Sequence, residues 1–348
     1  MSEIPSIIEQ AYPWRAGFFD FGKAKRDDVT YFNCAILERG DTDWLIVRRA
    51  VWRPGLKMGQ NGLMAFKLDS RLVPQVGFKI HMPGTESEHF EDPRCCIHAK
   101  NLWISACNFI VYGTQNSRWT GAHQVLCKVD PESWRGTERF DPVYGKNGPS
   151  LHGNIHAAGN TQDVHEKNWL WFSHEGALYM IYCAVPHIVT RWSDDVKFHA
   201  EWTTAPNYMP WRYGEIRGGT TPILAGGEYW TFFHSSLPWI GKKRQYHMGA
   251  YAFEARPPFR MTRITTRPII SGSTNDEWLP GKPPCVFPCG AIYRNKDWLV
   301  VGGSNDLSCF HIRIPHAELF ERTVSTLEGP KAKSGWLTKA GELLTSQV

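Results

Sequence analysis

The most regular feature of the chain is a run of alternating aromatic and aliphatic residues that recurs five times. The copies span 41–49, 100–109, 176–185, 227–236 and 296–305. Period-two alternation of β-branched and aromatic residues is typical of β-strands, and the Gly, Pro, Asn and Asp clusters between the copies are typical of turns. The pattern therefore predicts an all-β protein built from five similar units.

A second strand-like run follows each copy, at 63–69, 123–130, 187–193, 248–255 and 308–315. A repeat of this size with several strands in each copy is typical of blades around a central channel. We therefore predict a single five-bladed β-propeller over residues 1–348, with the first run of each copy as its inner strand. A β-sandwich with long insertions is the alternative on pattern alone. Helical periodicity is confined to 4–11 and 336–346, so we expect short segments outside the propeller at both termini.

Composition and charge narrow the class of ligand. Aromatic residues make up 13% of the chain, and such rings suit strand interiors and also form platforms for sugar rings or bases. The net charge of +5 contains no block of like charge, which suits an anionic substrate at a local site and argues against a nucleic-acid surface. No run reaches the roughly 20 apolar residues of a membrane helix, and the first residues do not resemble a signal peptide. The sequence predicts a cytoplasmic protein that binds neither nucleic acid nor membrane.

The nine cysteines show no paired Cys-x-x-Cys spacing, and several alternate with apolar residues. We interpret them as free thiols in a reducing compartment. Cys95, Cys96 and His98 are the nearest approach to a metal-ligand group, but they lack a second pair of ligands. Since the chain also lacks a dinucleotide fingerprint, we predict neither a metal nor an organic cofactor.

The segment HFEDPRCC contains the strongest candidate for a catalytic acid, Asp92. Pro93 restricts the backbone around it and favours an extended conformation at Asp92, so the carboxyl group is expected on a rigid turn. The structural alternative is a simple ion pair between Asp92 and Arg94.

Polar residues recur near the start or end of the strand runs in the later units. Each has an ordinary explanation, such as an exposed turn, a Gly-Gly turn or a core histidine. Together they supply cations and hydrogen-bond donors at corresponding points of successive blades. They are Glu166, Lys167, Asn168, Arg217, His234 and Tyr246.

One acid together with several cations fits phosphorolysis of a glycoside better than its hydrolysis. Inverting hydrolysis of a glycoside needs two carboxylates, one to protonate the leaving oxygen and one to activate water. Phosphorolysis needs only the acid, because phosphate is already a charged nucleophile that Arg, Lys, His and Tyr side chains bind and orient. These residues favour phosphorolysis.

An ordered series of motifs points to a family. It comprises the FN of YFNCAILERG, the R of WLIVRRA, FEDPR, EKNWLWF with GALYMIYCAVPH, RGGTTP, FFH, YHMGAYAFEARPPFRMTRI and CVFPCG. In this order, from about residue 30 to 315, the sequence resembles glycoside hydrolase family 130, five-bladed propellers that include β-mannoside phosphorylases, and the related mannosyltransferase/phosphorylases.

The resemblance implies a role for each matching residue. Asp92 would be the general acid, protonating the glycosidic oxygen by way of a mannose hydroxyl. The implied phosphate ligands are Lys167, His234 and Tyr246, with Arg118 or Arg217. Because 132–165 does not align clearly, Arg135 and Arg139 stay open as further phosphate ligands. The implied sugar-binding residues are Asn33, Arg49, Arg94 and Asn168.

Three hypotheses follow. The first is an inverting phosphorylase or transferase that exchanges mannose between mannose 1-phosphate and a sugar acceptor, with inorganic phosphate as co-substrate. The second is a phosphate-independent β-mannosidase on the same scaffold, with Glu86, Glu88 or Glu166 as its base. The third is a non-catalytic propeller that binds glycans through aromatic residues, although binding alone would not need Asp92 with the cation set. The sequence leaves homo-oligomerisation open.

Overall fold

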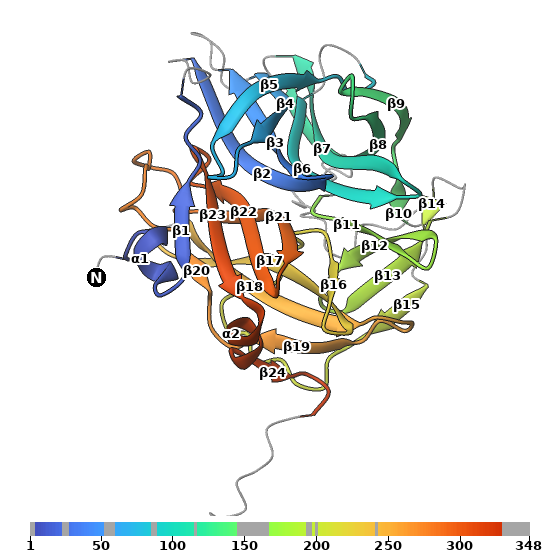
Figure 1. The fold of residues 1–348 in the computed structure, drawn as a ribbon, viewed down its shortest axis with the longest axis vertical. Coiled ribbons are helices and arrows are strands. Elements are labelled where there is room, and N and C mark those ends of the chain that lie inside the picture. Colours follow the sequence, from blue (N-terminus) through green and yellow to red (C-terminus); the bar gives the residue numbers. More distant parts are fainter. Residues whose placement is uncertain are drawn as a thin grey trace, which may run out of the picture.

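The predicted five-bladed β-propeller is confirmed, with five sheets arranged around a common axis (Figure 1). The structure is a computed structural model. It describes residues 4–22, 28–51, 60–84, 89–114, 117–144, 167–192, 197–198, 201–240 and 243–328, with side chains at all of these positions except 60, 109–114, 117–121, 143–144 and 197–198.

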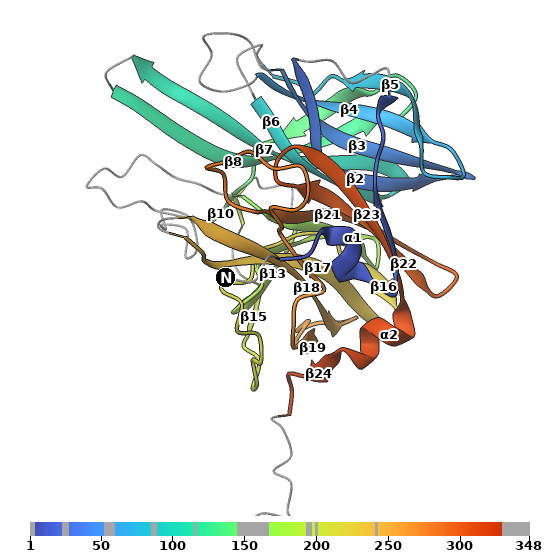
Figure 2. The same ribbon diagram turned by 90° about the vertical axis from the view of Figure 1, so that its left-hand side faces the viewer.

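The first two blades are regular four-stranded antiparallel sheets, each running outward from the axis in chain order. Blade 1 consists of β2 (Val29–Arg39), β3 (Thr42–Val51), β4 (Gln60–Leu68) and β5 (Pro74–Ile80). Blade 2 consists of β6 (His89–His98), β7 (Asn101–Thr114), β8 (Ser117–Asp130) and β9 (Arg135–Phe140). The β7–β8 ladder continues past the start of β6, so this hairpin projects beyond the rest of its blade (Figure 2).

The middle blades have short inner strands. Blade 3 consists of β11 (Leu170–His174), β12 (Ala177–Cys183), β13 (His187–Arg191) and β15 (Trp202–Thr204). Blade 4 consists of β16 (Ile223–Ala225), β17 (Glu228–Pro238), β18 (Arg244–Glu254) and β19 (Met261–Thr265), with β20 (Ile270–Ser271) and β24 (Thr323–Ser325) at its edge. A separate parallel pair joins β10 (Val143–Tyr144) to β14 (Lys197–Phe198).

The N-terminal segment completes the last blade. Blade 5 consists of β21 (Val286–Arg294), β22 (Asp297–Ser304), β23 (Ser308–Pro315) and β1 (Arg15–Phe18). β1 pairs antiparallel with β23, so backbone hydrogen bonds join the two ends of the chain and close the ring. The helix α1 (Ile7–Ala11) precedes β1. A capping box formed by Ser6 and Glu9 stabilises its N-terminus. After β23 lies α2 (His316–Glu321), which was not predicted. The predicted helix at 336–346 lies outside the described residues.

The five repeated runs are the second strand of each blade and not the inner strand, which corrects the sequence prediction. They fall on β3, β7, β12, β17 and β22. A second strand has neighbours on both sides in its own sheet and packs on adjacent blades through its faces, so its residues are almost continuously buried. The inner strands line the axis, where polar groups and bulges interrupt the pattern. The strongest hydrophobic signal therefore marks the middle of the blade.

The hydrophobic core is divided among the interfaces between blades. Five clusters of buried side chains lie at the five junctions of neighbouring blades. Because each blade buries both faces in this way, every junction helps to hold the inner strands in place around the axis.

Gly290 lies at a close contact between the inner strands of blades 5 and 1. A Cβ atom added there would lie 2.4 Å from the backbone nitrogen of Ile36 and 2.7 Å from Cα of Ala35. Both contacts are with backbone, which cannot move away as a flexible side chain could. Blades 5 and 1 can approach this closely only because residue 290 has no side chain.

We predict that Gly290→Ala destabilises the protein by about 1–3 kcal/mol, the usual cost of overpacking a core. Gly62→Ala is the matched control, because a Cβ added at Gly62 meets no atom within 4 Å. Its stability should stay within about 0.5 kcal/mol of wild type. Denaturant unfolding of both variants measures the difference, and equal stabilities would contradict the proposed close contact.

Candidate active site

Two inner strands carry matching bulges that bring Asn33 and Asp92 together. The register of β2 shifts between Phe32 and Cys34, and that of β6 shifts between Glu91 and Arg94. Asn33 and Asp92 adopt left-handed backbone conformations, with φ of 51° and 52°, so the extended conformation predicted for Asp92 is wrong. Asn and Asp tolerate this region better than most residues, and bulges redirect side chains next to functional sites. As a result, Nδ2 of Asn33 donates a hydrogen bond of 2.7 Å to Oδ1 of Asp92.

Arg48, on β3, binds two consecutive carboxylates of β6. Its Nη1 lies 3.1 Å from Oδ1 of Asp92, and its Nη2 lies 2.6 Å from Oε1 of Glu91. Asn61 completes the arrangement by donating to Oε1 of Glu91 at 2.8 Å and accepting from Nε of Arg48 at 3.1 Å. The guanidinium also lies over the ring of Phe32, 4.5 Å from its centroid. These contacts fix the orientation of Arg48, which in turn orients Asp92.

One carboxylate oxygen of Asp92 remains available for a ligand. Within the described part of the chain, both hydrogen bonds to the Asp92 carboxylate go to Oδ1, and Oδ2 receives none. The side chain is 13% exposed. Asp92 is therefore held at one oxygen, while the other can meet a substrate.

The two neighbouring carboxyl groups titrate differently. Burial opposes ionisation of Asp92, but Arg48, the hydrogen bond from Asn33 and the charge of Lys167 together hold its pKa below the usual range. Burial raises the pKa of Glu91 to about 7, although Arg48 opposes this shift. Below about pH 7 Glu91 thus keeps a proton, next to an ionised Asp92.

A third carboxylate, that of Asp306, lies near Arg48 and Asp92 in the turn between β22 and β23. The residue is exposed at the surface, but loss of hydration beside the neighbouring protein raises its pKa; Arg48 opposes this shift and the charge of Asp92 adds to it. Lys282 also acts on its pKa, lowering it. Blades 1, 2 and 5 therefore contribute to one charged cluster.

Arg94 is a buried residue that holds the backbone next to this cluster. It is 1% exposed, and its Nε donates to the backbone oxygen of Gly219 at 2.6 Å. Its Nη atoms donate to the backbone oxygens of Gly218 and Asp92 and to the side-chain oxygen of Asn168, at 3.1–3.2 Å. Arg94 contacts the backbone of Asp92 and not its carboxylate, so it joins blades 2, 3 and 4 as a structural support. The predicted sugar-binding role of Arg94 does not fit this burial, and Asn168 is occupied in the same network.

The two glycines of RGGTTP make this close packing possible. An added Cβ would lie 2.0 Å from the backbone oxygen of Asn168 at Gly218, and 2.1 Å from that of Phe232 at Gly219. The Gly-Gly pair thus allows neighbouring backbones to approach one another, and it places its carbonyl oxygens around Arg94.

The predicted phosphate ligands Arg217, His234 and Tyr246 lie next to one another. Arg217 and His234 pair through their backbones, with N–O distances of 2.8 and 3.2 Å. The ring of Tyr246 lies nearly parallel to that of His234, with centroids 6.1 Å apart. Lys167 is exposed at the start of blade 3, and its charge lowers the pKa of both Asp92 and His234. Lys167 is therefore near enough to act on both Asp92 and the group around His234.

His234 acts as a neutral group. Burial, followed by the charges of Arg217, Arg94 and Lys167, holds its pKa well below the usual value. Its Nδ1 is buried and has no hydrogen-bond partner among the described residues. A neutral imidazole can still donate one hydrogen bond, while Arg217 and Lys167 supply the positive charge.

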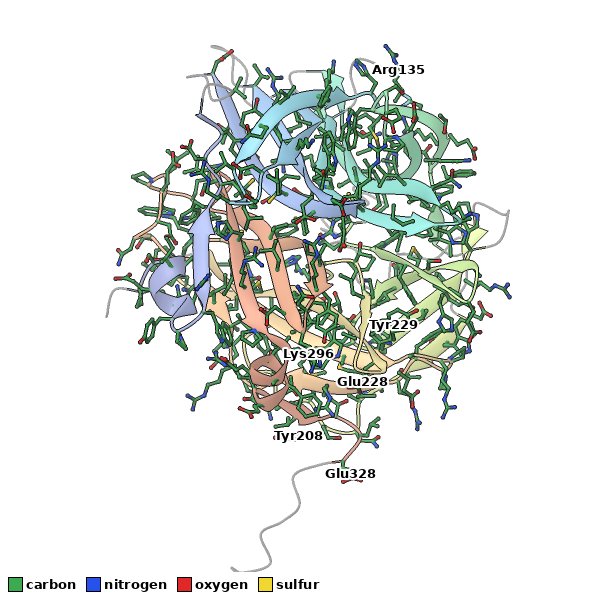
Figure 3. The ribbon with its side chains drawn as sticks, viewed as in Figure 1. Arg135, Tyr208, Glu228, Tyr229, Lys296 and Glu328 are labelled. Carbon is green, nitrogen blue, oxygen red and sulfur yellow. The ribbon has the colours of Figure 1, made fainter. Side chains whose placement is uncertain are left out.

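The structure changes the arginine assignment. The arginine of β3 that contacts Asp92 is Arg48, and Arg49 is not among its contacts in the described part of the chain. Adjacent residues of a strand point to opposite faces, so only one of the two can reach the cavity. Arg139 instead forms an ion pair with Asp141, and Arg135 lies at the periphery (Figure 3).

Some of the predicted site residues lie outside the part of the chain that the structure describes. The side chain of Arg118 is not described, although its backbone belongs to β8. Glu86, Glu88 and Glu166 also lie outside the described residues.

Sequence reasoning missed Arg48 and Asp306 and did not assign a role to Glu91 or Asn61. The pair of arginines in WLIVRRA was a usable signal, but choosing between them required the register of β3. Asp306 lies two residues after β22, in the motif GGSND that ends the fifth alternating run. Its position opposite Asp92 depends on ring closure.

Among the described residues, no group of three or more His, Cys, Asp and Glu side chains is arranged to hold a metal ion. None of the helices in the described ranges is long and apolar enough to cross a membrane.

Comparison with solved structures identifies the same fold in enzymes of mannoside metabolism. The β-1,2-mannobiose phosphorylase of Listeria innocua has a TM-score of 0.57 and 14% identity, covering 86% of this chain and 94% of its own. The mannose phosphorylase MPT-4 of Leishmania mexicana, solved with a phosphate ion, has a TM-score of 0.57 and 13% identity, covering 93% and 96%.

A third structure is described together with the finding that glycoside hydrolase family 130, a family of mannoside phosphorylases, contains glycoside hydrolases that target β-1,2-mannosidic linkages. Its TM-score is 0.54 and its identity 13%, covering 82% of this chain and 84% of its own. No family profile and no curated protein sequence matches the chain. At these identities the comparisons show a shared propeller fold.

The raised pKa of Glu91 predicts a pH dependence of stability. The folded protein keeps this proton up to about pH 7, whereas an unfolded glutamate releases it at its ordinary pKa of about 4.3. The folded state therefore binds more protons between these values, and stability falls as pH rises through this window. Glu91→Gln lacks this contribution, so its unfolding free energy relative to wild type should rise between pH 5 and 8.

Denaturant midpoints across that pH range measure the effect. Glu321→Gln, an exposed change in α2, is the control and should show no such trend. A difference between Glu91→Gln and wild type that stays constant with pH would show that Glu91 is ionised throughout.

Proposed function

We propose that this protein is an inverting glycoside phosphorylase or transferase that acts on β-mannosides. The observation that carries the proposal is a pair of neighbouring groups with different chemistry, which the charge of Lys167 links because it lowers the pKa of both Asp92 and His234. In one group, Asn33 and Arg48 hold Asp92 by one carboxylate oxygen. In the other, Lys167 and Arg217 provide positive charge, with His234 and Tyr246 beside them as donors. Phosphorolysis needs one positioned acid and one anion site. The fold shared with mannoside phosphorylases supports this reading.

In the proposed reaction, protonated Asp92 donates a proton toward the glycosidic oxygen through a hydroxyl group of the mannose. The bond between that oxygen and C1 breaks, and a phosphate oxygen forms a new bond to C1 from the opposite face. The products are mannose 1-phosphate and the released sugar, which carries the transferred proton. The reverse reaction returns the proton to Asp92 and transfers mannose to an acceptor.

Phosphate binding would help to load the acid. Without a ligand, Arg48 and Lys167 favour the ionised form of Asp92. A phosphate dianion beside Lys167 would offset part of that positive potential, so the pKa of Asp92 would rise. The protein would then protonate its acid when the nucleophile is in place.

Hydrolysis is the second candidate, and Asp306 is the observation that favours it. Inverting hydrolysis needs a second carboxylate to activate water, and Asp306 is an exposed carboxylate near enough to Asp92 for their charges to interact. The hydrolases in the same structural group make this reaction compatible with the fold. A propeller that only binds glycans is disfavoured, because it would not need Asp92 and the cation group in one cavity. A cytoplasmic location and the lack of a cofactor stay predictions.

We expect turnover of β-linked mannobioses to depend on inorganic phosphate and to yield mannose 1-phosphate. The measurement is product analysis by chromatography or phosphorus NMR, with and without phosphate. Free mannose formed at the same rate in both conditions would overturn the phosphorylase proposal in favour of hydrolysis. In that case Asp306→Asn should abolish turnover.

Asp92→Asn should reduce turnover by about a hundred- to ten-thousandfold, the usual contribution of a positioned acid. Asn matches the size of Asp and tolerates the left-handed conformation at residue 92, so the fold should persist. Asp141→Asn is the control, because Asp141 pairs with Arg139 and His123 away from the cavity. It should leave turnover unchanged. Single-turnover rates and melting temperatures are measured on the same preparations; an active but less stable Asp92→Asn protein would rule out the catalytic assignment.

A further inference from the structure

His89 lies at the start of β6, two residues before Glu91, and contacts the neighbouring blade 1. Its Nδ1 accepts a hydrogen bond of 3.2 Å from the backbone nitrogen of Asn61, the second residue of β4. A backbone N–H group can only donate, so Nδ1 carries no proton and the neutral ring carries its proton on Nε2. Burial and the charge of Arg48 lower the pKa of His89, which favours this neutral form. The structure thus defines both the charge and the tautomer of His89.

Asn61 lies beyond the part of β4 that pairs with β5 in the described chain. That pairing ends at Leu63 and Ile80, two residues short of Asn61. Asn61 is 8% exposed, and a buried N–H group without a partner is costly. The imidazole of His89 supplies the acceptor, so it helps to hold the backbone of Asn61 in place.

The side chain of Asn61 is part of the charged cluster. Its Oδ1 accepts from Nε of Arg48 at 3.1 Å, and its Nδ2 donates to Oε1 of Glu91 at 2.8 Å. With Nε bound to Asn61, Nη1 of Arg48 lies 3.1 Å from Oδ1 of Asp92. A shift of the Asn61 backbone would disturb both contacts of its amide and, through Arg48, the carboxylate of Asp92. His89 is therefore connected to Asp92 through a short chain of hydrogen bonds.

We infer that His89 is a positioning residue: it acts on the central site through Asn61 and does not bind substrate itself. By fixing Asn61, it keeps Arg48 in the orientation that binds Asp92. Supporting contacts of this kind limit the movement of a reacting group, and a small displacement of such a group lowers the rate. The expected effect on turnover rests on the proposed function, whereas the hydrogen bonds themselves do not.

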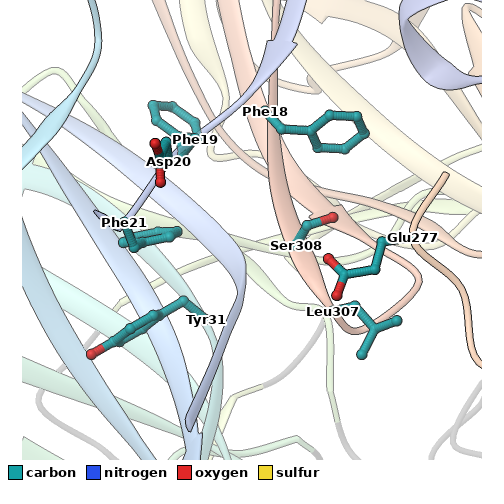
Figure 4. Close-up of a pocket in the computed structure, with 8 residues that line it drawn as sticks. All are labelled: Phe18, Phe19, Asp20, Phe21, Tyr31, Glu277, Leu307 and Ser308. Atoms are coloured by element: carbon teal, nitrogen blue, oxygen red, sulfur yellow. The ribbon is translucent and has the colours of Figure 1, made fainter. Parts of the chain in front are cut away.

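A direct contact between His89 and the substrate is the alternative role. It would use the Nε2–H group, which is a donor for a sugar hydroxyl. The pocket in Figure 4, about 250 Å³ between blade 5 and β2, is lined in the described part of the chain by other residues, so a ligand bound there would not contact His89. The two roles use different ring nitrogens, so different replacements preserve them. Asn places an amide oxygen near the position of Nδ1, and Gln places an amide nitrogen near the position of Nε2.

The test compares three full-length variants, His89→Leu, His89→Asn and His89→Gln, in phosphate-dependent turnover of a β-linked mannobiose. His89→Leu removes the acceptor, so kcat should fall about two- to tenfold, the scale of one neutral hydrogen bond, while KM changes little. His89→Asn should restore most of the loss, and His89→Gln should not. Recovery with Gln and not with Asn would show direct contact with the substrate and overturn the inference, as would equal losses in all three variants.

The titration of Glu91 gives a second readout that does not depend on the reaction. Nδ2 of Asn61 donates to the Glu91 carboxylate, and a donor favours the ionised form, so its displacement should raise the pKa of Glu91. A displaced Arg48 would shift this pKa in the same direction, because its charge lowers it. The charged groups that act on Glu91 are the same in every variant: Arg48, Asp92, Lys167 and Asp306.

Carbon NMR of the glutamate carboxyl groups measures this pKa across a pH series. It should be higher in His89→Leu than in wild type and should return in His89→Asn. An unchanged Glu91 pKa in His89→Leu would overturn the inference. If no variant and no wild type converts mannobiose but the pKa shifts as expected, the proposed function fails and the positioning role of His89 stands.

Two controls separate this route from a general loss of stability, with melting temperatures measured on the same preparations. His81→Leu removes an exposed histidine next to β5 and should leave both kcat and the Glu91 pKa unchanged. In an Asn61→Ala background, His89→Leu should cause no further loss of turnover, because the amide through which His89 acts is absent. A full loss in that background would contradict the inference.

Discussion

The central site depends on the placement of one half-buried guanidinium, that of Arg48. It lies among Glu91, Asp92 and Asp306, three carboxylates that come from two other blades. Three negative charges in so small a volume would repel one another, and burial would force most of them to take up protons. Arg48 makes the ionised form of Asp92 tolerable, while Glu91 remains the carboxyl that holds a proton. The different pKa values of Glu91 and Asp92 thus depend on how Arg48 is shared between the two carboxyl groups.

Bulges in two adjacent inner strands fix the backbone that carries this cluster. Asn33 and Asp92 occupy left-handed conformations in bulges of adjacent inner strands, which costs conformational energy that the surrounding blades must offset. Arg94 contributes to this by donating to backbone oxygens of blades 2 and 4 and to the side-chain oxygen of Asn168 before blade 3. A side chain held in this way loses little further freedom when a substrate binds, which is the usual basis of an accurately positioned catalytic group.

The opposite sides of the cavity are linked electrostatically. Lys167 lowers the pKa of Asp92 on one side and of His234 on the other, so a ligand that neutralises Lys167 changes both groups. An anion bound there would favour the protonated acid, and protonation of the acid would in turn favour the anion, because such coupling is reciprocal.

The sequence by itself determined the class of fold and most of the candidate residues. Five alternating runs sufficed to predict five blades, because the middle strands of a propeller are buried on both faces and carry the strongest hydrophobic signal. Asp92 and the group of Lys167, Arg217, His234 and Tyr246 were recognisable from local motifs. Only the tertiary structure decided which arginine reaches Asp92, that Arg94 is a buried support, and that Asp306 completes the cluster. These facts depend on strand register and on the closure of the ring, which bring together side chains from distant parts of the chain that no local pattern relates.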